Sequence, residues 1–142
     1  EDDADLKSAI EISQAEEFIE KLPEGTEHHI AQMGRNVSGG QKQRLSIARA
    51  LARKPEILIF DDSFSALDYR TDAKLREGLA KELPGTTKVI VAQRISTIRH
   101  ADQILVLDRG EAVGIGTHEE LMRSCSVYRE IATSQLSAAE LQ

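Results

Sequence analysis

Apolar positions recur along this chain at two spacings, one typical of helices and one typical of buried strands. Helical spacing marks residues 41–54 and 70–83, whose inward positions are Leu45, Ala48, Leu51, Ala52, Leu75, Leu79 and Leu83. An earlier acidic stretch is also predicted to be helical, because Ser13 and Glu16 have the spacing of a capping box before an apolar run. Residues 24–36 are expected to form a loop.

Three continuous apolar runs have the length of strands and lie within residues 57–60, 88–92 and 103–107. An uninterrupted apolar run predicts burial on both faces, as in a parallel sheet. Residues 111–115 follow a turn sequence and are expected to pair antiparallel with the third run. Strands that alternate with helices predict a layered α/β fold.

Composition narrows the classes of function. The 142 residues carry 18 Lys and Arg against 24 Asp and Glu, a net charge of −6, which argues against a nucleic-acid partner. No apolar run approaches the roughly 20 residues of a membrane-spanning helix. The single cysteine, Cys125, forms no internal disulfide, which is typical of a reducing compartment. The four histidines lack the spacing of a metal site.

The first candidate site is the sequence Ser38-Gly39-Gly40-Gln41 at the start of a predicted helix. Glycines let backbone N–H groups approach a ligand closely, and a helix N-terminus favours anions, so the turn could bind phosphate. The same spacing also fits a plain capping box between Ser38 and Gln41. For these four residues alone, the two interpretations are equally good.

The second candidate site is the acidic pair Asp61 and Asp62, which follows the apolar run of residues 57–60. An acid at the carboxyl end of a buried parallel strand faces the crevice in which α/β folds bind ligands. Asp61 is therefore a candidate Mg²⁺ ligand, and a strand-end residue that caps the next turn is the structural alternative.

In these residues the chain resembles the ATP-binding cassette (ABC) family. Residues 38–41 resemble its signature motif and Asp61 its Walker B acid. The resemblance implies a partial P-loop NTPase (RecA-like) parallel sheet with helices on both faces, plus part of the ABC helical subdomain. It further implies that residues 1–53 belong to that subdomain, residues 55–122 to the ATPase core and residues 123–142 to C-terminal helices.

The resemblance also assigns roles to single residues. Ser38, Gly39, Gly40 and Gln41 would contact ATP, as would Ser65 and Asp68 of a segment similar to the family's D-loop, and Asp61 would hold Mg²⁺. Two residues depart from the family at its catalytic positions. Asp62 stands where the family usually has Glu, and Gln93 stands where it usually has His. The shorter Asp62 side chain and the uncharged Gln93 are both expected to weaken hydrolysis.

The phosphate-binding motif Gly-x-x-x-x-Gly-Lys-Ser/Thr does not occur in the sequence. The resemblance therefore covers the second half of a cassette, and the P-loop is expected upstream of Glu1. An intact transporter of this kind is an ATPase, whereas these 142 residues alone are expected to be inactive. An engineered or degraded fragment is favoured over a naturally short protein.

Residues 94–102 and 116–121 resemble exporters of the multidrug type. Such cassettes work in pairs on the cytoplasmic side of the cell membrane, each joined to transmembrane helices. Because Asp62 and Gln93 weaken one ATP site while residues 38–41 are intact, the expected assembly is a heterodimer with a second ABC half-transporter. This chain would carry the degenerate Walker B and would export drugs or lipids.

Two other functions stay open. A chromosome-maintenance or DNA-repair ATPase head shares a Ser-Gly-Gly signature, but heptad coiled coils are not visible, Gln41 differs from the acidic residue common there, and the chain is acidic. A regulatory nucleotide-binding module without turnover is the third possibility, which Asp62 and Gln93 allow for the site on this chain.

Overall fold

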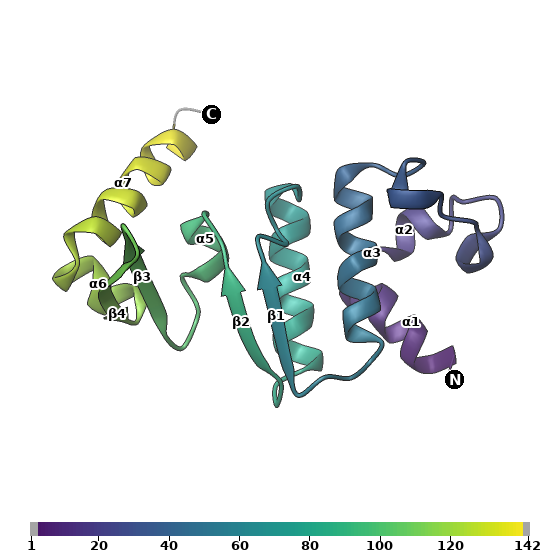
Figure 1. Cartoon of the computed structure of the whole chain (residues 1–142), viewed down its shortest axis with the longest axis horizontal. Helices are drawn as coiled ribbons and strands as arrows, with labels where there is room; N and C mark the ends of the chain where they lie inside the picture. The colour runs from purple at the N-terminus through teal and green to yellow at the C-terminus, as the bar shows by residue number, and fades with distance from the viewer. Residues whose placement is uncertain (1–2, 141–142) are drawn as a thin grey trace. The chain divides into compact units, whose positions relative to one another are not determined.

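The computed structural model describes residues 3–140 and divides them into two compact units, one ending at Val91 and one beginning at Ala92 (Figure 1). Each unit combines helices with one two-stranded sheet. No helix in the described part of the chain is both long and apolar enough to span a bilayer.

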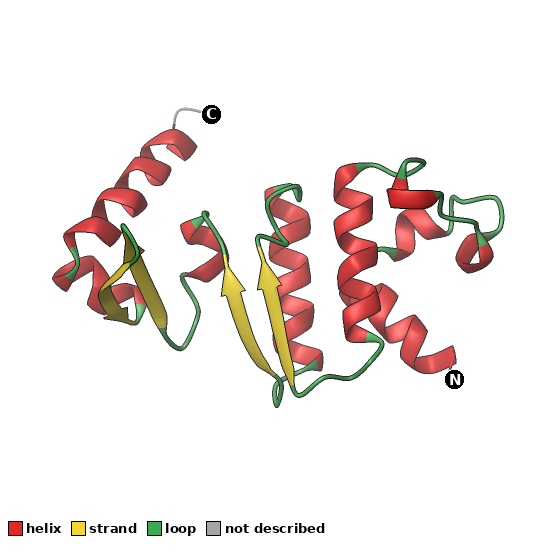
Figure 2. Ribbon diagram, in the orientation of Figure 1, coloured by secondary structure: helices red, strands yellow, loops and turns green. Residues whose placement is uncertain are grey.

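The first unit contains four helices, two strands and two short 3₁₀ turns (Figure 2). The helices are α1 (Asp3–Ile12), α2 (Glu16–Ile19), α3 (Gly39–Leu51) and α4 (Tyr69–Glu82). The strands are β1 (Ile57–Asp61) and β2 (Thr87–Val91), and the 3₁₀ turns are Gly25–Glu27 and Gln32–Gly34. The two predicted helices that begin near residues 41 and 70, and the strand predicted at residues 57–60, are thus confirmed.

The core of the first unit joins α1, α3, α4 and β1. Strands β1 and β2 run parallel, with Ile57 beside Thr87 and Asp61 beside Val91. Alternate residues of β1 point into this core. The buried cluster consists of Ala9, Ile12, Ile47, Leu51, Leu58, Phe60, Phe64, Leu67, Leu75 and Leu79.

The prediction that the apolar strands are buried on both faces is wrong for β1 and β2, and also for the third apolar run, in which Leu105 and Leu107 are exposed. Ile59 is 70% exposed, and Ile57, Val89 and Val91 are exposed as well. Among the described residues, helices pack only against the face that carries Leu58 and Phe60. An apolar run records what a strand can bury, so it does not tell which of its faces is covered.

The N-terminal capping box was also predicted wrongly. Helix α1 continues to Ile12, and the Oγ of buried Ser13 donates to the carbonyl oxygen of Ile10 at 3.0 Å. A serine at the end of a helix can bond back to the preceding turn, and this bond uses its hydroxyl. Gln14 then turns the chain with a φ of 59°, and α2 begins without a side-chain cap.

The second unit contains α5 (Ile95–Ile98), β3 (Ile104–Asp108), β4 (Glu111–Gly116), α6 (His118–Ser124) and α7 (Ser126–Glu140). Strands β3 and β4 are antiparallel, as predicted, with an irregularity between Val106 and Leu107. The side chain of Thr117 caps α6 in a capping box with Glu120. The buried hydrophobic cluster of this unit consists of Ile104, Val106, Leu121, Cys125 and Tyr128.

Candidate functional site

Helix α3 begins with the predicted capping box. The backbone N–H of Gln41 donates to the Ser38 Oγ at 3.2 Å, and the backbone N–H of Ser38 donates to the Gln41 Oε1 at 2.9 Å. Ser38 itself has extended backbone angles, as expected of an N-cap. The Ser38 Oγ acts as an acceptor in this box, and the first amides of an α-helix have no intrahelical acceptor, so capping and anion binding are compatible.

The two glycines of this turn have different surroundings. A side chain at Gly39 would meet open space, because a Cβ there would have no described heavy atom within 4 Å beyond its chain neighbours and its own helix backbone. A Cβ at Gly40 would lie 3.1 Å from the carbonyl oxygen of Ala66. A Cβ at Gly40 would thus crowd the close approach of α3 to the segment after β1, whereas Gly39 faces outward.

At the carboxyl end of β1, the two acids differ in backbone conformation. Asp61 is exposed, and its carboxylate has no hydrogen bond or ion pair within the described residues. Asp62 has a φ of 51°, in the left-handed region that aspartate tolerates better than most residues. Its backbone N–H donates to the Val91 oxygen at 3.0 Å and extends the parallel pairing by one residue. The strand-end position predicted for both acids is confirmed.

Gln43 connects α3 to the segment that carries the second acid. Its Nε2 donates to the Asp62 carbonyl oxygen at 3.4 Å, and its Oε1 accepts from the Ala66 N–H at 3.2 Å. The Ser65 hydroxyl also donates to the Asp62 oxygen, at 3.0 Å. Sequence reasoning missed Gln43, although its position one turn after Gly39 places it on the same side of α3.

Asp68 is the N-cap of α4. Its carboxylate accepts from the Thr71 backbone N–H at 2.9 Å and from the Thr71 hydroxyl at 2.7 Å. These two hydrogen bonds hold the pKa of Asp68 below its usual value, and the bond from the Thr71 hydroxyl has the larger effect. The structural alternative of a helix cap is therefore realised, and the ATP-contacting role of Asp68 stays a prediction.

This cap predicts a pH-dependent contribution to stability. Because the folded pKa of Asp68 is depressed, its contribution is present above the unfolded pKa of about 4 and is lost as the pH falls through the folded pKa. We expect Asp68→Ala to lower the melting temperature at pH 7, and the difference from wild type to shrink below about pH 4. Circular dichroism melts at several pH values test this, with Glu77→Ala on the exposed side of α4 as the control. A difference that stays constant down to pH 2.5, which is about 1.5 units below the usual aspartate pKa, would contradict the assignment.

Gln93 belongs to the second unit, where its side chain is exposed. Its carbonyl oxygen accepts a hydrogen bond from the Gln135 Nε2 at 2.6 Å. The other candidate residues, from Ser38 to Asp68, all lie in the first unit. The first unit brings together the Ser38–Gln41 turn, the acidic pair and the segment similar to the D-loop through the contacts of Gln43 and Gly40. The fourth predicted motif, which carries Gln93, belongs to the second unit.

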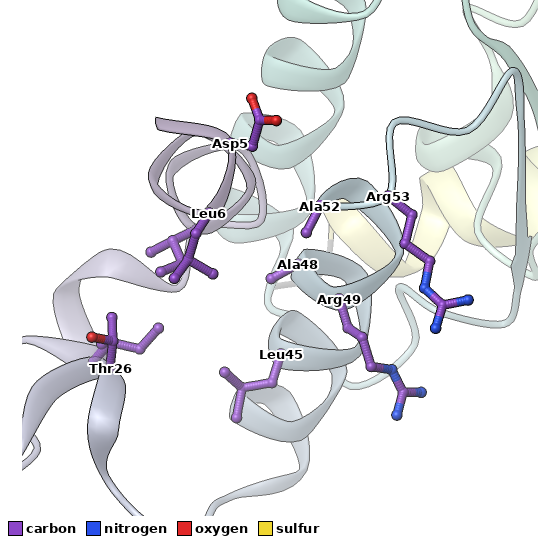
Figure 3. A pocket seen from close by; sticks show the side chains of 10 residues that line it. Asp5, Leu6, Thr26, Leu45, Ala48, Arg49, Ala52 and Arg53 are labelled. Atoms are coloured by element: carbon purple, nitrogen blue, oxygen red, sulfur yellow. The ribbon is translucent and has the colours of Figure 1, made fainter. Parts of the chain in front are cut away.

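Described residues of the first unit line a smaller and a larger pocket. One, of about 160 Å³, runs between α3 and β1 and is lined by Gln43, Ser46, Ile59, Asp61 and Ser63 among others. The other, of about 520 Å³, is lined by α1, Thr26 and α3 and contains none of the predicted site residues (Figure 3). The side chains of Arg49 and Arg53 extend away from Leu6 at its edge. The smaller pocket therefore connects Asp61 with the Gln43 contact.

The donor set fits magnesium bound together with a nucleotide. Mg²⁺ is usually held by one or two carboxylates, water and substrate phosphates, and Asp61 offers one exposed carboxylate. No group of three or more potential metal ligands occurs in residues 3–140, so a metal here would need most of its ligands from phosphate and water. The α3 N-terminus supplies amides suited to a phosphate oxygen.

Comparison with known proteins points to one family. The profile of the ABC transporter family matches residues 3–65. A Mycoplasma genitalium protein, provisionally named ABC transporter ATP-binding protein MG014, is 49% identical over 130 residues, which make up 92% of this chain and 21% of that protein. The uncharacterized ABC transporter ATP-binding protein YfiB of Bacillus subtilis is 48% identical over 131 residues, 92% of this chain and 22% of the relative.

A solved structure extends the match to the fold. A bacterial Atm1-family ABC exporter with ATP bound superimposes with a TM-score of 0.90 and 36% identity, over 94% of this chain and 24% of that chain. The chain thus spans about a fifth of the length of the curated relatives it matches. These matches confirm the resemblance seen in the motifs, and the chain belongs to the ABC transporter family of ATP-binding domains.

Proposed function

We propose that the chain is the C-terminal part of the ATP-binding cassette of an ABC exporter, which couples ATP binding and hydrolysis to the export of drugs or lipids. One observation carries the proposal. The capped N-terminus of α3 and the acidic end of β1 lie in one unit and are joined through the amide of Gln43. An anion-binding helix start beside a metal-binding carboxylate suits a magnesium nucleotide.

Each residue of the α3 turn has a separate task in this proposal. The Ser38 hydroxyl and the amides of Gly39 and Gly40 donate hydrogen bonds to a phosphate oxygen. The Gln41 side chain holds the Ser38 backbone and keeps the turn in its binding conformation. Because a capped turn is already ordered, the donors need no rearrangement when charge develops on the phosphate.

The residues at the carboxyl end of β1 act on the other side of the nucleotide. Asp61 would hold Mg²⁺, which neutralises phosphate charge when it is bound. Asp62 occupies the position from which the attacking water is oriented, and Gln93 the position of the family's phosphate-contacting His. Ser65 and Asp68 would meet the nucleotide near the partner cassette.

The assembly we propose is a heterodimer of ABC half-transporters in the cell membrane, with this domain on the cytoplasmic side and transmembrane helices on the same polypeptide. Its support is the combination of an intact Ser38–Gln41 turn with the two departures Asp62 and Gln93. A Rickettsia felis protein is 43% identical over 135 residues and is provisionally named an export ATP-binding/permease protein. That name joins an ATP-binding part and a permease part in one protein. The matched residues make up 95% of this chain and 23% of the Rickettsia protein.

Gly39 allows a clean test, because its two readouts separate folding from ligand contact. In this chain, Gly39→Ala should leave the melting temperature unchanged or slightly raised, since its Cβ meets open space. In the intact transporter the same change should slow ATP hydrolysis by about 10²-fold, because a methyl group would displace the phosphate. Gly40→Ala is the comparison, since it should also lower the melting temperature of the chain. Full ATPase activity in Gly39→Ala would remove the turn from the ATP site.

The chain on its own should bind ATP weakly. Its sequence contains none of the Gly-x-x-x-x-Gly-Lys-Ser/Thr motif that supplies most phosphate contacts in P-loop ATPases. Calorimetric titration of the chain with Mg-ATP should therefore show no saturable heat. An ATPase assay of the chain alone should give no hydrolysis above the background of the buffer. Saturation in the low micromolar range would mean that the binding free energy arises from residues 38–68.

A further inference from the structure

The side chain of Gln135, in α7, makes two hydrogen bonds to the backbone on either side of Arg94. Its Nε2 donates to the carbonyl oxygen of Gln93 at 2.6 Å, and its Oε1 accepts from the N–H of Ile95 at 2.7 Å. The residues joined are 42 and 40 positions apart in the sequence. A single amide therefore links the C-terminal helix to the segment that carries Gln93.

This pattern is the one a neighbouring strand would provide. In a parallel sheet, one residue donates its N–H to the residue before its partner and accepts at its carbonyl oxygen from the residue after that partner. Arg94 has extended backbone angles, with a φ of −92° and a ψ of 125°. The Gln135 amide thus takes the place of one residue of a neighbouring strand and holds residues 93–95 extended up to the start of α5.

Packing of helix α7 holds the Gln135 side-chain amide in place. Tyr128, Ala132 and Gln135 follow one another at helical spacing and share one face of α7. Tyr128 is 2% exposed, and its hydroxyl forms a 2.8 Å hydrogen bond with the His118 Nδ1. Ile95 and Ile98 of α5 pack against the same cluster as Tyr128. Packing and hydrogen bonds together hold Gln135 against the segment.

We propose that Gln135 is a positioning residue for Gln93, and that α7 controls the direction of the Gln93 side chain through this amide. The importance of Gln93 rests on the proposed function, whereas the clamp itself rests on the two hydrogen bonds. Loss of the clamp frees one carbonyl and one N–H at the start of α5, so the backbone that orients Gln93 can leave its extended conformation.

The clamp is tested first in this chain by amide hydrogen exchange. Gln135→Met keeps the length of the side chain but removes both bonds, and it should speed exchange of the Ile95 N–H by about 3- to 10-fold. Gln135→Glu keeps an acceptor, so Ile95 exchange should stay near the wild-type rate. Glu130→Met, at an exposed position of α7, is the matched control and should change neither rate. Unchanged Ile95 exchange in Gln135→Met would overturn the clamp.

The positioning role is tested in the intact transporter by the release of labelled ATP after a chase with unlabelled nucleotide. Gln93→Ala and Gln135→Met should both speed release several-fold from the ATP site to which Gln93 belongs. A merely structural defect would lower the amount of retained ATP without changing its release rate. If only Gln93→Ala speeds release, the positioning role is wrong. If neither variant does while Ile95 exchange changes, the clamp stands and the proposed role of Gln93 fails.

Discussion

Ser38→Ala should slow ATP turnover of the intact transporter by about 10²–10³-fold, whereas Asp62→Asn should slow it only mildly. In the proposed heterodimer, the α3 turn contacts the ATP that is hydrolysed. Ser38→Ala removes a hydroxyl donor directed at the charge that develops on the phosphate. Asp62 belongs to the other site, where a carboxylate one methylene shorter than Glu already orients water poorly. The two variants should therefore differ by at least tenfold.

Steady-state ATPase assays in detergent or membranes would measure this order, with the catalytic Glu of the partner replaced by Gln as the reference. That replacement should abolish turnover, and Ser38→Ala should resemble it. Ser38→Thr keeps the hydroxyl and the cap, so it should retain most of the activity and separates the hydroxyl from the backbone turn. If Asp62→Asn proved as damaging as Ser38→Ala, the site on this chain would be catalytic, and the degenerate-subunit proposal would be wrong.

Leu75→Ala should lower the free energy of unfolding of this chain by about 2–5 kcal/mol. Leu75 is 0% exposed and lies in the cluster that joins α4 to β1. Alanine is the best helix former, so α4 keeps its local preference and the loss reports the lost apolar burial together with the cavity left behind. Against a total stability of about 5–15 kcal/mol for a typical domain, such a change is large.

Urea denaturation followed by circular dichroism measures this loss. Lys74→Ala, at the exposed neighbouring position, is the matched control and should stay within about 0.5 kcal/mol of wild type. The slope of free energy with urea should not change, because the same surface unfolds in both variants. A loss below about 1 kcal/mol for Leu75→Ala would mean that this part of the core is loosely packed.

Local patterns predicted much of the fold. Helix α3 and strand β1 follow from the periodicity of their apolar residues, and the two capping boxes at Ser38 and Thr117 follow from pairs three residues apart. The β3–β4 hairpin follows from its turn, where Arg109 and Gly110 both have positive φ, as a tight two-residue hairpin requires.

The features that sequence reasoning missed depend on partners far away in the chain. Gln43 and Gln135 are glutamines without a local signal, and their hydrogen bonds span 19 to 42 residues. Ser13 was misplaced because its hydroxyl had two possible partners, one on each side, and the pattern did not rank them. The ATP-contacting roles of residues 38–41, Ser65 and Asp68 stay predictions, since they concern atoms of a ligand.

The left-handed backbone of Asp62 has a consequence for protein engineering. Short polar side chains tolerate that conformation because they can bond to nearby backbone groups, while longer ones gain less from it. Installing the family's glutamate at this position would lengthen the carboxylate but also place a less suited residue at a φ of 51°. A designer who wants a faster enzyme here would therefore adjust the turn of residues 62–66 together with the acid, and Gln43 is the first residue of its surroundings to redesign.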